Sequence, residues 1–133
     1  MTVPEPAPIT VWSRNNVVLD EAYYLRMTNA YTAPRDGRFE VTLDLHDWPG
    51  DYGLEILIMT YSDYLNYIDY ESYSAWHLSL FTERTHFFNS GTIHEGELYQ
   101  VIIDNTDLGW DDTDFDFVND AAYFDVEAVF QGY

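Results

Sequence analysis

The sequence predicts an all-β protein: a single-domain, jelly-roll-like β-sandwich of about eight strands with an extended N-terminal arm. Three observations support this. Aromatic residues make up 18% of the chain, and their rings pack well on a pleated sheet. Several short segments alternate between apolar and polar residues, and turn-forming residues separate them. The length of 133 residues suits one domain with one core.

The clearest alternation lies in the segments 39–45 and 124–130. Phe39, Val41 and Leu43 are apolar, whereas the residues between them are polar or acidic. A period of two with one polar face indicates a strand that is half buried against a core. The strands that we predict cover residues 9–13, 17–27, 38–45, 54–61, 76–81, 85–88, 98–104 and 122–131.

The first eight residues form the predicted arm, and residues 9–133 form the predicted sandwich domain. Pro4, Pro6 and Pro8 exclude a helix there and favour extended polyproline geometry. A stiff arm loses little entropy when it lies across a partner. We therefore expect the three prolines to contribute to an interface with a neighbouring subunit rather than to pack on their own domain.

The charge balance is strongly acidic. The formal net charge is −19, from 24 acidic residues against five arginines, and the chain has no lysine. Such a charge destabilises a compact fold unless salt screens it, so the composition resembles that of proteins from extreme halophiles. The alternative is a DNA mimic whose carboxylates imitate phosphates. Direct binding of nucleic acid is not expected, because the sequence has no basic patch.

Other sequence features exclude several classes of protein. The chain has no cysteine, so disulfides and thiolate metal sites are excluded. No apolar stretch is long enough to span a membrane, so we expect no membrane insertion. The first nine residues lack the basic and apolar regions of a signal peptide. A leader that was trimmed away remains an alternative.

One segment carries a resemblance to a known family. Residues 98–109, which read LYQVIIDNTDLG, resemble a late strand and polar loop of bacterial pre-peptidase C-terminal domains. The resemblance covers residues 36–130 and implies a final strand over residues 123–130. It also implies an accessory binding or structural module rather than an enzyme.

An acidic loop follows this strand. It comprises Asp104, Asn105, Asp107, Asp111, Asp112, Asp114, Asp116 and Asp120. The loop does not match an EF-hand, because Phe117 stands where the turn needs glycine and Tyr123 stands where a glutamate should bind. We interpret it as a solvated loop or as a weak site for Ca²⁺ or another cation, and no cofactor is required. The candidate ligands are Asp107, Asp111, Asp112, Asp114 and Asp116.

Tyrosines recur at every third position in the middle of the chain. The tyrosine segment consists of Tyr61, Tyr64, Tyr67, Tyr70 and Tyr73 and ends at Trp76. This spacing predicts a short helix or 3₁₀ segment followed by a loop. Its rings either cover one end of the sandwich or form an exposed contact surface, and tyrosine suits interfaces. A sugar-binding platform is a further interpretation. We select these six residues as candidate interface residues.

The sequence offers no catalytic motif. The segment from His94 to Leu98 lacks the second histidine of a zinc-protease helix. Neither a nucleophile elbow nor a phosphate-binding glycine loop is present. We therefore expect the protein not to be an enzyme.

Three functional hypotheses follow. The leading one is a structural protein of a haloarchaeal virus, which decorates or cements the capsid at the virion surface. It would act by self-association, with a trimer as the leading candidate, and by docking on capsid shell proteins. The alternative is a secreted or surface carbohydrate-binding module of a halophile. The second alternative is an acidic DNA mimic that inhibits a defence protein in the cytoplasm.

Overall fold

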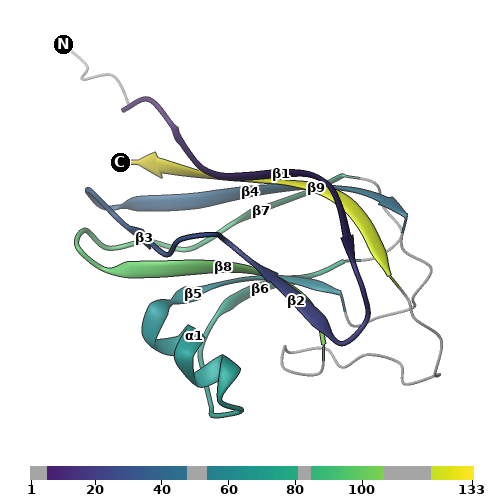
Figure 1. Cartoon of the computed structure of the whole chain (residues 1–133). Helices are drawn as coiled ribbons and strands as arrows, with labels where there is room; N and C mark the ends of the chain where they lie inside the picture. The colour runs from purple at the N-terminus through teal and green to yellow at the C-terminus, as the bar shows by residue number, and fades with distance from the viewer. Residues whose placement is uncertain (1–5, 48–53, 81–84, 107–120) are drawn as a thin grey trace.

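The computed structural model describes residues 6–47, 54–80, 85–106 and 121–133. These residues form nine strands and one helix (Figure 1). The elements are β1 (Ile9–Leu19), β2 (Tyr23–Arg26), β3 (Tyr31–Thr32), β4 (Gly37–Asp47), β5 (Glu55–Thr60), α1 (Tyr61–Ile68), β6 (Trp76–Ser79), β7 (Thr85–Asn89), β8 (Leu98–Asn105) and β9 (Ala122–Gly132).

The strands pair in the pattern of a jelly roll. The first half of the chain pairs with the second half in reverse order, all antiparallel: β1 with β9, β2 and β3 with β8, β4 with β7, and β5 with β6. The β9 sheet therefore has the order β1-β9-β4-β7, and the β8 sheet has the order β2-β8-β5-β6. This is a two-sheet antiparallel sandwich with jelly-roll order. The predicted fold class is confirmed.

Some predicted boundaries were wrong at the start of the chain. Residues 9–13 and 17–27 were expected to be two strands, whereas β1 runs without a break to Leu19. A bulge absorbs the irregular residues, with Asn16 at a φ of 56°. The chain then turns at Ala22, whose φ is 74°, and enters β2. β3 was missed because two residues are too short to show an alternating pattern.

The main core lies between the two sheets. The alternating residues of β4 and β9, among them Phe39, Leu43 and Phe124, are fully buried there, as their pattern predicts. Phe39 makes edge contacts with Tyr99 of β8 at 5.9 Å and with Phe130 of β9 at 6.0 Å between ring centroids. Aromatic pairs of this kind add to the stability that burial itself provides.

The β8 sheet is buried on both faces. Ile56 and Ile58 of β5 face the main core, whereas Leu57 and Met59 face the opposite side. There they form a second core with Ile102 and with tyrosines of α1. Figure 1 shows α1 against this outer face of the sheet. The double burial explains why the sequence of β5 is a nearly continuous apolar run rather than an alternating pattern.

Candidate functional site

The tyrosine segment begins with the helix that its spacing predicts. Thr60 caps α1, because its hydroxyl accepts a hydrogen bond from the backbone N–H of Asp63 at 3.2 Å. The same hydroxyl donates to the Asp63 carboxylate at 2.9 Å. The helix ends at Ile68, and Tyr70 follows with a φ of 61° that turns the chain away.

The rings of the tyrosine segment divide into buried and exposed groups. Tyr64 and Tyr67 are buried in the second core, and Tyr61 and Tyr73 are half buried. Tyr70 is 84% exposed and Trp76 is 36% exposed. The expectation of an exposed contact surface is therefore corrected for the two buried residues. These two rings cover part of the sandwich instead, as the other interpretation predicts, although they cover a face of the β8 sheet rather than an end of the sandwich.

Two half-buried rings pack edge to face on the buried ring of Tyr67. Its centroid lies 5.5 Å from that of Tyr24 and 5.4 Å from that of Tyr73, with both pairs nearly perpendicular. Tyr24 also lies within 3.4 Å of Tyr64, hydroxyl to hydroxyl. Burial and this hydroxyl contact raise the pKa of Tyr64 to about 12. The tyrosines therefore act as one packed cluster that joins α1 to β2.

Asp104 and Asn105 are not part of a solvated loop, which corrects that assignment for both, whereas the predicted strand over residues 98–104 is confirmed at Asp104. They belong to β8 and are completely buried. Tyr67 donates a hydrogen bond from its hydroxyl to the Asp104 carboxylate. Thr106 donates to the same carboxylate from its backbone N–H at 2.8 Å and from its hydroxyl at 2.9 Å. Burial and the adjacent carboxylate raise the pKa of Tyr67 far above its usual range.

The candidate cation ligands of the acidic loop lie outside the described residues; they are Asp107, Asp111, Asp112, Asp114 and Asp116. Pro4 of the arm lies outside them as well. The predicted Ca²⁺ site and the part of the interface assigned to Pro4 stay predictions.

The arm contacts its own domain where it joins β1. Gln131 of β9 donates a side-chain hydrogen bond to the Pro6 carbonyl at 2.8 Å. A groove of about 230 Å³ lies between Pro6, Ala7 and Ile9 on one side and Pro34, Arg35, Phe130 and Gly132 on the other. Pro8 is exposed. The expectation that the arm does not pack on its own domain is therefore corrected at Pro6.

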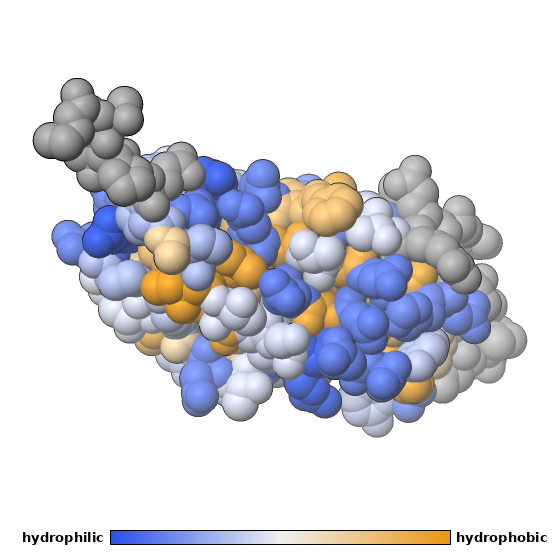
Figure 2. Space-filling model, turned by 90° about the horizontal axis from the view of Figure 1, so that it is seen from above, coloured by the Kyte–Doolittle hydropathy of each residue, from blue (hydrophilic) through white to orange (hydrophobic). Residues whose placement is uncertain are grey.

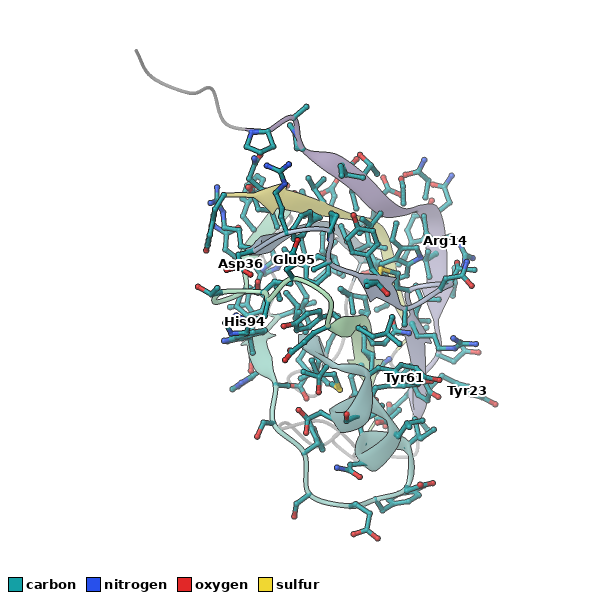
Figure 3. All side chains as sticks on the ribbon, turned by 90° about the vertical axis from the view of Figure 1, so that its left-hand side faces the viewer. Arg14, Tyr23, Asp36, Tyr61, His94 and Glu95 are labelled. Carbon is teal, nitrogen blue, oxygen red and sulfur yellow. The ribbon has the colours of Figure 1, made fainter. Side chains whose placement is uncertain are left out.

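A wider groove lies beside the start of α1, at the end of the molecule shown in Figure 3. It has a volume of about 650 Å³ and is lined by Thr60, Tyr61, Ser62, Leu65, Asn66, Glu97 and Leu98. Tyr61 supplies an aromatic ring, Leu65 and Leu98 supply apolar side chains, and the remaining residues supply hydroxyl, amide and carboxylate groups. The Glu97 carboxylate is held by the Tyr99 hydroxyl, which donates to it at 2.8 Å.

One cluster was missed in the sequence: Asp44 and His46 of β4 and Asp125 of β9. One potential ligand atom from each side chain lies within 4.8 Å of the others. His46 Nε2 lies 3.1 Å from Asp125 Oδ2, and His46 Nδ1 lies 3.9 Å from Asp44 Oδ2. The backbone N–H of Asn16 donates to Asp125 Oδ1 at 2.7 Å. This hydrogen bond, together with His46, lowers the pKa of Asp125.

Large apolar side chains also lie on the surface. Phe87 is 74% exposed, Val18 is 65% exposed and Tyr23 is 64% exposed. Figure 2 looks onto the molecule from above and shows apolar atoms between hydrophilic side chains. The surface is therefore not uniformly charged.

Comparisons with known proteins give one distant likeness. No family model matches the sequence, and no curated protein matches it. A chain of a solved structure titled "Structure of Triatoma Virus (TrV)" is similar with a TM-score of 0.47 and 9% sequence identity. The likeness covers 96% of this chain and 66% of that chain. This likeness is too distant to assign a function to the chain. The resemblance to pre-peptidase C-terminal domains stays a prediction. Within the described ranges, no helix is long and apolar enough to cross a membrane.

Proposed function

We propose that this chain is a non-enzymatic structural protein of a halophilic virus, which decorates or cements the capsid by self-association and docking. The observation that carries the proposal is the jelly-roll pairing, in which β1 pairs with β9 and each later strand pairs inward. Viral capsid proteins share this architecture with lectins and cupins. A fold alone does not determine a function, so the proposal also needs evidence from the residues at the surface.

The exposed apolar side chains supply that argument. Tyr70, Phe87 and Tyr23 each expose most of their surface. Aromatic residues are enriched at protein interfaces, and they lose little entropy on contact. In molar salt the repulsion between subunits of charge −19 is screened, so contacts of this kind can provide the affinity. These features support a role in assembly at a virion surface.

Sedimentation of the full chain at about 2 M NaCl tests the proposal. We expect a homo-oligomer, with a trimer as the leading candidate. Phe87→Ser and Tyr70→Ser should shift the equilibrium towards monomer without changing the melting temperature, because neither side chain is packed in a core. Glu127→Gln, an exposed change on β9, is the control and should leave assembly unchanged. A parent protein that stays monomeric at every concentration would contradict the proposal.

The groove beside Tyr61 favours a second candidate, a carbohydrate-binding module. An aromatic ring stacks on the apolar face of a sugar, and the Asn66 amide and the Glu97 carboxylate bond its hydroxyl groups. A glycan array tests this alternative. Binding of one glycan that is abolished by Tyr61→Ala and weakened by Glu97→Gln would support it. The absence of binding to every glycan would leave the structural role as the only proposal.

A further inference from the structure

We propose that Asp44, His46 and Asp125 form a binding site for a divalent transition-metal ion such as Zn²⁺ on the outer face of the β9 sheet. The proposal is independent of the function proposed above. It rests on three observations: the register of β4 and β9, two bulges in the sheet, and the hydrogen bonds that orient the carboxylates.

The register places two negative charges directly opposite each other. Asp44 of β4 is the cross-strand partner of Asp125 of β9, and both side chains are partly exposed on the same face. Like charges in this position destabilise a sheet. A cation bound between the two carboxylates would attract both of them and so offset their mutual repulsion.

Two bulges bring further groups to the pair. His46 is the extra residue where the β4–β9 register shifts between Leu45 and Asp47. The second shift lies in β1 between Arg14 and Val17 and contains Asn16. Bulges commonly re-aim side chains next to functional sites. Here one bulge supplies an imidazole beside Asp44, and the other supplies a backbone N–H to Asp125.

The hydrogen bonds leave one oxygen of each carboxylate facing the imidazole. Asp125 Oδ1 accepts from Asn16, and Asp44 Oδ1 accepts from the Thr85 hydroxyl at 3.4 Å. The two Oδ2 atoms lie nearest to His46. The ring of Tyr123 packs on the imidazole at 4.9 Å between centroids, and its hydroxyl donates to the Asn16 side chain at 2.8 Å. Outer groups of this kind orient the ligands of metal sites.

The donor set selects the class of metal. Imidazole suits Zn²⁺ and neighbouring transition metals, whereas Mg²⁺ and Ca²⁺ prefer oxygen ligands alone. Ligands at about 2.0 to 2.2 Å from a tetrahedral ion lie about 3.4 Å apart. The three ligand atoms lie within 4.8 Å of one another, so side-chain rotation of these exposed and partly exposed residues would bring them to that spacing. One imidazole nitrogen and two carboxylates leave the remaining positions of the ion to water.

Titration calorimetry with ZnSO₄ on the full chain tests the proposal. We expect saturable binding of one equivalent that an excess of Mg²⁺ does not displace. His46→Gln and Asp125→Asn should each weaken Zn²⁺ binding about tenfold or more. The matched controls are His94→Gln, an exposed histidine in a loop, and Glu127→Gln, an exposed acid on the same face of β9 as Asp125. Both controls should bind Zn²⁺ as the parent does.

Two results would overturn the proposal. The first is a Zn²⁺ affinity in His46→Gln that equals that of the parent. The second is displacement of Zn²⁺ by Mg²⁺ to the same extent in the parent and in Asp125→Asn, which indicates diffuse binding to surface carboxylates. Circular dichroism of each variant establishes that it is folded. If one of the two site variants fails to fold, the other still decides the outcome against its own control.

Discussion

The hydroxyl of Tyr67 in α1 donates a hydrogen bond to the carboxylate of Asp104 in β8, and both side chains are buried. This contact connects the helix to the centre of the β8 sheet on the face opposite the main core. It also places a negative charge inside the protein, where donors must compensate the loss of water. Tyr67 and Thr106 together supply three such donors.

The first prediction concerns this contact. Tyr67→Phe keeps the ring but removes one donor from a buried carboxylate, so the free energy of unfolding should fall by about 1 to 3 kcal/mol. Tyr70→Phe is the control, because that side chain is 84% exposed and should change stability very little. Urea denaturation in molar salt measures both. Equal stability of the two variants would show that the hydrogen bond contributes nothing.

The second prediction is a loss of stability at alkaline pH. The usual tyrosine pKa is 10.0, and burial together with contact with Tyr24 raises the pKa of Tyr64 to about 12. Because this pKa is raised in the folded state, the contribution of Tyr64 to stability is complete below pH 10 and is lost as the pH rises towards 12. Burial also raises the pKa of Tyr67 and Tyr73. The tyrosinate absorbance that comes from Tyr64, Tyr67 and Tyr73 should therefore appear together with unfolding rather than before it, and ionisation of all tyrosines in a folded protein would contradict this.

The third prediction is that folding depends on salt. The melting temperature should rise strongly between about 0.1 M and 2 M NaCl, because the Debye length falls from about 10 Å to about 3 Å or less. The cause is the net charge of −19. A melting temperature that stays constant across this range would remove the argument for a halophilic source and favour the DNA-mimic hypothesis.

The fourth prediction concerns the acidic loop. Ca²⁺ in low salt should raise the melting temperature, since oxygen-rich clusters are the ligands that Ca²⁺ prefers. The combined change Asp112→Asn, Asp114→Asn and Asp116→Asn should reduce that rise. An equal response of parent and variant would identify the loop as merely solvated.

Much of the fold could be predicted because burial on one face leaves a visible pattern. The alternation around Phe39 and around Phe124 identified two central strands that pair with each other. The tyrosine spacing likewise indicated the short helix. Both signals are local, so they need no knowledge of how distant segments meet.

The candidate sites depended on information that the sequence does not display. Tyr64 and Tyr70 look equivalent in the sequence, yet one is buried and the other is not, because only one faces the β8 sheet. Asn105 looks like part of a polar loop, but β8 continues through it. Asp44 and Asp125 are far apart along the chain, and only the register of two strands makes them neighbours.

The reverse pairing of the two halves has a consequence for how the protein is made. The partner of Ile9 in β1 is Phe130 in β9, so β1 pairs with a strand that is synthesised after all the other described strands of this domain. Until β9 emerges, β1 and β4 present unpaired edges and bare apolar faces, which are prone to aggregate. Pairing across such long separations is also slow. The sandwich of this domain can therefore close only after β9 has been synthesised, and a fragment that stops before β9 is expected to aggregate.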